Sequence, residues 1–156
     1  MLGSEIVLRE LRNLRQRIAE NIRRNGQTAS GRSERSLIVE DEGESIVLYG
    51  RKAFGTLETG RRGGRVPRNF ASILFQWSLD KRIQFSEERE RWSFAFALSK
   101  RIQKEGTLLH KQGGRADVYS NEIPVTLERI NQSLGSMLAM RIVEQIELQD
   151  TNGISS

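Results

Sequence analysis

Apolar residues near the start of the chain recur at the spacing of a helix. They follow one another at intervals of four, three, four and four positions, namely at Val7, Leu11, Leu14, Ile18 and Ile22. These intervals place them on one face of a helix whose other sides are polar. Ser4 suits the beginning of this helix and Asn25-Gly26 suits its end. We therefore predict a helix over residues 4–25 with an arginine-rich outer face.

Three further segments, 70–81, 87–105 and 124–147, carry the same kind of pattern. Each begins with a residue suited to a helix start: Asn69, Ser86 and Pro124, respectively. The predicted apolar stripe of the last helix consists of Leu127, Ile130, Leu134, Leu138, Ile142 and Ile146. Aromatic residues gather in the middle third of the chain, and we expect them in the core because such side chains dominate core burial: Phe70, Phe75, Trp77, Phe85, Trp92, Phe94 and Phe96.

Two short runs rich in β-branched residues lie between the first two helices. They cover residues 36–40 and 45–49 and are joined by an acidic turn, Glu40 to Glu44. The pattern predicts an α+β fold, in which a small antiparallel β-sheet packs with a long N-terminal helix, two middle helices and a long C-terminal helix. Two long loops complete a single structural domain over residues 1–149, and a polar C-terminal tail follows over 150–156.

The segment from Gly50 to Arg68 stands out by its composition. It holds six basic residues, one acidic residue and five glycines. Glycine raises the entropy cost of ordering a segment, and cations stay in water, so we expect no contribution to a core. A mobile basic loop on a rigid scaffold is suited to bind an acidic partner. With a residue of the second loop, the candidate contact residues are Arg51, Lys52, Arg61, Arg62, Arg65, Arg68 and Arg115.

Composition argues against several classes of protein. The chain has 156 residues, a net charge of +5, no cysteine and one histidine, His110. Disulfides and thiolate metal sites are thereby excluded, and a zinc site or a Ser/His/Asp site is not supported. The glycine-rich stretches lack the lysine and Ser/Thr of a phosphate-binding loop. No apolar run has the length of a membrane span, and the N-terminus lacks a signal-peptide pattern. We therefore expect no catalytic site, no cofactor, no metal and no membrane contact.

The order of these features resembles the neck, head–tail joining and tail-completion proteins of tailed bacteriophages. Members of that family begin with a helix, continue through a Gly/Ser-Arg-Leu-type segment into a strand and a glycine- and arginine-rich loop, and end in a long helix. The resemblance extends from about residue 28 to 146, and its segments are Ser30-Gly31-Arg32-Ser33, Ser36 to Val39, Tyr49-Gly50-Arg51, Pro67, Ile73 to Trp77, Phe94 to Ala97, Lys104 to Thr107 and Gly113 to Ser120. The first loop is longer and more basic here than in many relatives.

This resemblance implies a structural virion protein without enzymatic activity. It implies a homomeric ring, six- or twelve-fold, that lies in the phage neck or tail around the DNA channel and is assembled in the host cytoplasm. The expected partners are other copies of the chain, neighbouring portal, adaptor or tail proteins, and genomic DNA in transient contact with the lumen. Two alternatives stay open: a free-standing nucleic-acid-binding protein that uses the basic loop and the first helix, and an enzyme, which the lack of an acid–base constellation disfavours.

Overall fold

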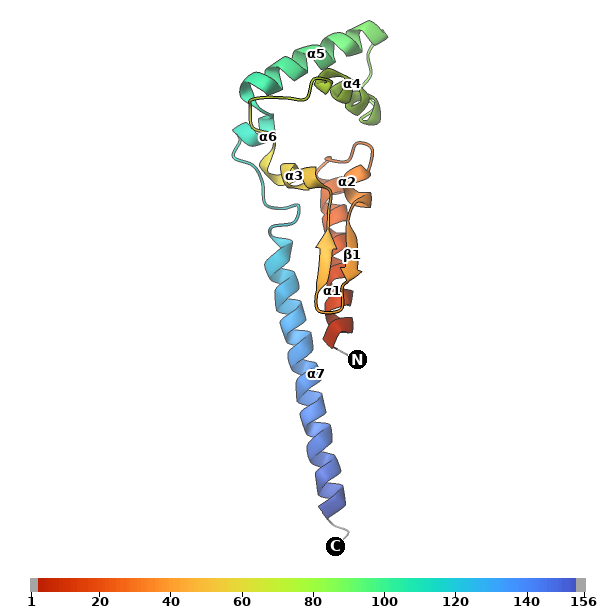
Figure 1. The fold of residues 1–156 in the computed structure, drawn as a ribbon, viewed down its shortest axis with the longest axis vertical. Coiled ribbons are helices and arrows are strands. Elements are labelled where there is room, and N and C mark those ends of the chain that lie inside the picture. The colour runs from red at the N-terminus through yellow and green to blue at the C-terminus, as the bar shows by residue number, and fades with distance from the viewer. Residues whose placement is uncertain (1–2, 154–156) are drawn as a thin grey trace.

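The computed structural model describes residues 3–153 of the chain, with side chains described for residues 3–149. The elements are α1 (Gly3–Arg24), α2 (Arg32–Arg35), β1 (Ile38–Asp41), β2 (Ile46–Tyr49), the 3-10 helix η1 (Lys52–Gly55), α3 (Thr56–Thr59), α4 (Phe70–Asp80), α5 (Glu88–Glu105), α6 (Leu108–Lys111) and α7 (Glu122–Gly153). The α+β prediction is confirmed. The molecule is elongated, with α4 and α5 at one end and the C-terminal part of α7 at the other (Figure 1).

A lower body is built from α1, the β-hairpin and the first half of α7. Helix α1 packs against both strands and against α7. Its apolar face supplies most of the core, which consists of Leu14, Ile18, Ile22, Leu37 and Val118. Gly26 ends the helix in the left-handed region at φ 67°, and the amide of Gln27 donates to the carbonyl of Ile22 at 3.0 Å. The predicted helix end at Asn25-Gly26 is therefore confirmed.

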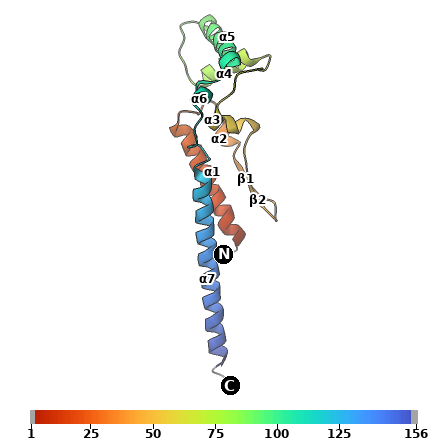
Figure 2. The ribbon, with the colours of Figure 1, turned by 90° about the vertical axis from the view of Figure 1, so that its left-hand side faces the viewer.

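The two strands form an antiparallel pair in which Ile38 faces Tyr49 and Asp41 faces Ile46. Their turn closes when the amide of Glu42 donates to the carbonyl of Ser45 at 2.9 Å. Gly43 adopts φ 86°, and its amide donates to the Asp41 carboxylate at 2.9 Å. The hairpin with an acidic turn is thus confirmed, and Figure 2 shows its turn projecting beside α1.

An upper body consists of α4, α5 and α6. Phe70, Leu74, Ala95 and Ile102 form its buried cluster. The Phe75 and Trp92 rings stack at 4.2 Å between centroids, which joins α4 to α5. These two helices pack mainly against each other, whereas among the long helices α1 is the one that covers both strands. The two middle helices therefore pack on each other and not on the sheet, which differs from the predicted packing of the sheet with all four long helices.

Several finer expectations are wrong. Ile6 and Glu10 are buried in α1, whereas Val7 is only partly buried. Ser86 does not cap α5; its backbone amide instead donates to the Glu90 carboxylate. Phe96 is 56% exposed and lies outside the core. The helix expected to end near residue 147 continues to Gly153, so the tail predicted from Asp150 begins as helix, and its last residues, 154–156, lie outside the described residues.

Candidate functional site

The predicted basic loop contains more structure than its composition indicates. It folds into η1 and α3, and the side chains of Phe54 and Leu57 pack against the lower core. Phe54 also contacts the ring of Tyr119, with centroids 5.7 Å apart. The expectation that this segment contributes nothing to a core is wrong, because Phe54 and Leu57 pack against the lower core and Val66 packs against the buried cluster of the upper body.

Glu58, the one acidic residue of the segment, fixes it to the chain just before α7. Its side chain is buried and accepts hydrogen bonds from the amides of Val118, Tyr119 and Ser120 at 3.1, 2.7 and 2.9 Å, and from the Ser120 hydroxyl. Burial opposes ionisation, but these donors outweigh it, so the pKa of Glu58 lies below its ordinary value. The carboxylate therefore joins two segments that are distant in sequence.

Residues 60–64 cross the end of α5 and pair with the chain there. The amide of Arg61 donates to the Thr107 hydroxyl at 2.9 Å, and the amide of Thr107 donates to the carbonyl of Arg61 at 2.8 Å. Gly106 adopts φ 81°, and a Cβ at this position would lie 2.6 Å from the Arg61 carbonyl oxygen. Only glycine fits so close an approach in that conformation.

The candidate contact residues fall into two groups. Arg61 lies over the Phe70 ring, 5.1 Å from its centroid, and donates to the carbonyl of Arg65. Arg115 forms a forked pair with Asp117 at 2.5 and 2.8 Å, which lowers the pKa of that carboxyl. The guanidinium groups of these two arginines are therefore engaged within the chain. The other five are exposed: Arg51, Lys52, Arg62, Arg65 and Arg68. These five residues do not lie together on one element but at separate points along the segment.

A second basic surface lies on the outer face of α1. Arg12, Arg15 and Arg23 of α1 and Arg35 of α2 line one groove of about 430 Å³, here named the arginine groove. Glu20 and Glu34 also line it, but Glu20 accepts from Gln16, and Glu34 accepts from Thr28. Within the described part of the chain, the α1 arginines of this groove have no hydrogen-bond or ion-pair partner. The arginine-rich outer face predicted for the first helix therefore includes a concave basic site.

The tip of the hairpin, here named the acidic turn, carries four exposed carboxylates: Glu40 and Asp41 at the end of β1, and Glu42 and Glu44 in the turn itself. Glu42 accepts a hydrogen bond from the Tyr49 hydroxyl, which raises the pKa of that tyrosine. Among the described residues, no ion pair neutralises any of the four. The turn is therefore a compact negative surface with a fixed backbone.

Helix α7 exposes a long apolar surface. Its predicted stripe divides: Ile130 and Leu134 are partly buried beside α1, whereas Leu127, Leu138, Ile142 and Ile146 are each more than half exposed. Leu138, Ile142 and Ile146 are spaced four residues apart and so lie on one face, here named the distal stripe. These three positions do not face the rest of the chain, because α1 does not extend far enough to cover them (Figure 1).

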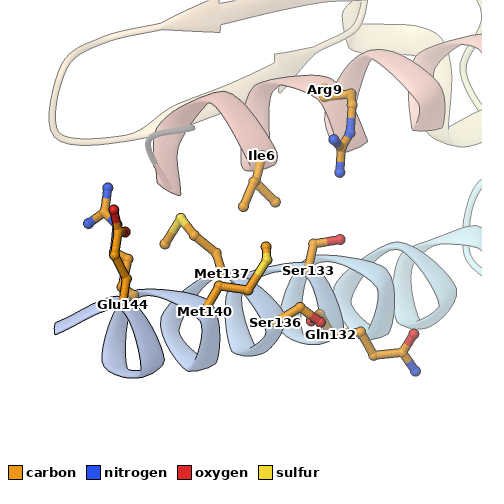
Figure 3. Close-up of a pocket in the computed structure, with 9 residues that line it drawn as sticks. Ile6, Arg9, Gln132, Ser133, Ser136, Met137, Met140 and Glu144 are labelled. Atoms are coloured by element: carbon orange, nitrogen blue, oxygen red, sulfur yellow. The ribbon is translucent and has the colours of Figure 1, made fainter. Parts of the chain in front are cut away.

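Two further hollows adjoin the helices. The first, of about 700 Å³, lies where α1 begins beside α7; Ile6 points toward Met137 and Met140 (Figure 3), and the rest of the lining is polar or charged: Arg9, Gln132, Ser133, Ser136, Arg141 and Glu144. The second, of about 550 Å³, is an apolar groove in the upper body, bounded by Phe70, Leu74, Trp77, Leu98, Ile102 and Leu108. Leu108 at its edge is 65% exposed. The second hollow adds to the apolar surface that the single chain leaves uncovered.

Residues suited to chemistry are dispersed. His110 is exposed on α6, whose cap is the Thr107 hydroxyl. Within residues 3–149, no group of three or more His, Asp or Glu side chains is arranged to hold a metal ion. No helix of the described chain has the length and hydropathy that a membrane crossing requires.

Comparison with family models, with curated proteins and with solved structures finds no match to this chain. The resemblance to phage neck and tail-completion proteins therefore depends on the order of sequence features alone. Sequence reasoning missed the Glu58 contact and the division of the α7 stripe. The isolated carboxylate in a basic, glycine-rich segment was the available signal for the first, and the length of the last helix beyond that of α1 was the signal for the second.

Proposed function

We propose that the protein is a structural virion subunit of a tailed bacteriophage, which forms a homomeric ring in the neck or tail around the DNA channel. The main evidence for assembly is the distal stripe. Its residues Leu138, Ile142 and Ile146 are 54 to 58% exposed, and they lie on the part of α7 that extends beyond α1. Contiguous exposed apolar surface of this kind marks an interface. The phage context comes from the family resemblance.

A second copy of the chain is the proposed occupant of the distal stripe. A ring requires heterologous contacts, in which one face of a subunit meets a different face of the next. The molecule offers such a pair of dissimilar ends, with the projecting α7 at one end and the apolar groove of the upper body at the other (Figure 1). Because the two ends are far apart within one chain, they can meet only between copies.

A free-standing nucleic-acid-binding protein is the second candidate. The exposed arginines of the arginine groove favour it, since guanidinium groups pair with phosphates. It predicts tight binding to DNA whose affinity falls steeply with salt, by a slope of about 0.9 for each phosphate contact. The ring predicts weak binding, because each retained contact would slow the passage of DNA. A filter-binding titration against salt concentration separates the two candidates.

The assembly proposal is tested by the mass of the protein in solution and in purified virions. We expect the wild type to form a ring and the Ile142→Asp, Ile146→Asp double variant to stay monomeric. Because both side chains are more than half exposed, the double variant should keep the thermal unfolding profile of the monomer. A monomeric wild type that is also absent from rings in the virion would contradict the proposal.

Ser93→Asp serves as the control for an added carboxylate outside the stripe. Ser93 is exposed on α5, outside the distal stripe, so an added carboxylate there changes the charge without touching the proposed contact. Mass photometry should show the same ring for this variant as for the wild type. Loss of the ring in the control would mean that added negative charge, and not the apolar stripe, governs assembly.

A further inference from the structure

We propose that the acidic turn of one copy docks into the arginine groove of a neighbouring copy. This inference rests on the proposed homomeric assembly and names a charged contact within it. The groove is lined by four guanidinium groups from α1 and α2, and the turn presents four exposed carboxylates. Arginine and carboxylate groups pair through two parallel hydrogen bonds, which fix orientation as well as attraction.

The arginine groove is a preformed site. Arg12, Arg15 and Arg23 project from one rigid helix of 22 residues, and Arg35 is held when its guanidinium donates to the carbonyl of Ser30 at 2.8 Å. From Arg12 to Arg23 the helix rises by about 16 Å, the product of eleven residues and 1.5 Å for each. This length accommodates a turn of several residues, so its carboxylates can contact successive arginines.

The acidic turn is a fixed projection. Asp41 accepts from the amide of Gly43, and the amide of Glu42 donates to the carbonyl of Ser45. The turn lies at the free end of the hairpin, clear of the upper body (Figure 2). A rigid turn loses little conformational entropy when it binds, so its charge attraction is not offset by ordering.

Within the described residues, no ion pair neutralises either surface, although Glu20 and Glu34 also line the groove. Among the described residues no ion pair joins a carboxylate of the turn to an arginine of the groove. Like charges crowded on each surface repel one another, and contact between two copies relieves both repulsions at once. A nucleic acid would neutralise the groove alone and would leave the turn unexplained, so a second copy fits both surfaces better.

The groove is also a better partner for the turn than the glycine-rich segment. In that segment Arg61 is engaged with Phe70 and with the Arg65 carbonyl, and the nearby Arg115 is paired with Asp117. Its remaining cations are spread along the chain from Arg51, just before η1, to Arg68, just before α4. The groove instead gathers its arginines in one concave surface of about 430 Å³.

A charge-reversal exchange tests the contact. One variant carries Arg12→Glu, Arg15→Glu and Arg23→Glu, and the other carries Glu40→Lys, Glu42→Lys and Glu44→Lys. We expect each variant alone to associate at least about tenfold more weakly than the wild type, because like charges then face each other. A protein that carries both sets of changes should regain association, since the opposite charges are restored with their places exchanged. Mass photometry over a range of salt concentrations measures this.

The control places the same change of charge on another helix, as Arg89→Glu, Lys100→Glu and Lys104→Glu on α5, all exposed. It should associate within about twofold of the wild type, because salt screens charges that do not meet directly. Thermal unfolding checks that each variant folds. Where a reversed variant does not fold, Gln replacements at the same positions take its place and should still weaken association.

Three outcomes overturn the contact. If the wild type forms a ring and the doubly reversed protein does not regain association, the inference is wrong and the proposed function stands. If the groove variant assembles normally and loses only its binding to duplex DNA, the groove is a nucleic-acid surface. If the wild type never assembles, alone or in virions, the proposed function and this contact fail together.

Discussion

The two halves of α7 belong to one continuous helix, yet they have opposite surroundings. In the first half, Glu122 and Thr126 accept hydrogen bonds from the Arg17 guanidinium at 2.8 and 2.7 Å, and Thr126 is 2% exposed. In the second half, Ile142 and Ile146 are more than half exposed. The first half is therefore part of a folded monomer, whereas the second half presents a surface for another molecule. Apolar periodicity alone does not distinguish these two uses.

The largest expected effect compares two isoleucines, one in the α1 core against which the first half of α7 packs and one in the second half of α7. Ile22 is fully buried in the core beneath the start of α7, and Ile142 is 58% exposed. Ile22→Ala should lower the free energy of unfolding of the monomer by about 2–5 kcal/mol through lost burial and a cavity. Ile142→Ala should lower it by less than about 0.5 kcal/mol, while weakening assembly. Urea unfolding below the assembly concentration measures both.

The contact of Glu58 with the residues before α7 gives the next effect. Glu58→Gln should cost about 2 kcal/mol, since hydrogen bonds to a charged acceptor are replaced by weaker ones. The pKa of Glu58 is lower in the folded chain than its ordinary value of 4.5. Its stabilising effect is therefore complete above that value and is lost as the pH falls through the folded pKa. Unfolding measured across the acidic range should show a smaller loss of stability for the variant than for the wild type.

The smallest effect concerns the ion pair at the start of α7. The side chains of Arg17 and Glu122 are 21% and 23% exposed, and burial of Glu122 is outweighed by hydrogen bonds from Asn21 and Arg17, which lower its pKa. A double-mutant cycle of Arg17→Gln and Glu122→Gln should give a coupling of about 1 kcal/mol. The same cycle on Arg141 and Glu144 in the second half should give a coupling near zero. Equal couplings would contradict the difference between the halves.

Sequence patterns predicted the long elements well because each depends on local spacing. The helix beginning near Ser4 and the strands around Val39 and Val47 need only their own residues for recognition. The pairing of Glu58 with Val118 to Ser120 joins positions 60 to 62 residues apart, so no local pattern indicates it. Likewise, a stripe identifies the apolar face of a helix without indicating which element covers it.

The candidate site was predicted in part. The exposed arginines of residues 50–68 and the basic face of the first helix were recognised from composition and periodicity. Other features depend on how distant segments pack. Examples are the position of Arg61 over the Phe70 ring and the place of Arg35 beside the α1 arginines. Such packing follows from the burial of apolar side chains over the whole chain, which a single window of sequence does not contain.

The hydrogen bond between the amide of Arg115 and the carbonyl of Glu58, at 2.8 Å, has a consequence for the modularity of the chain. Residues 59–114 leave the lower body and return to it at the same point, so the upper body is an insertion with adjoining ends. Closing the chain with a short linker in its place would demand little loop-closure entropy and would keep α1, the hairpin and α7 together. Evolution can therefore lengthen, shorten or exchange that helical unit without disturbing the frame from which α7 projects.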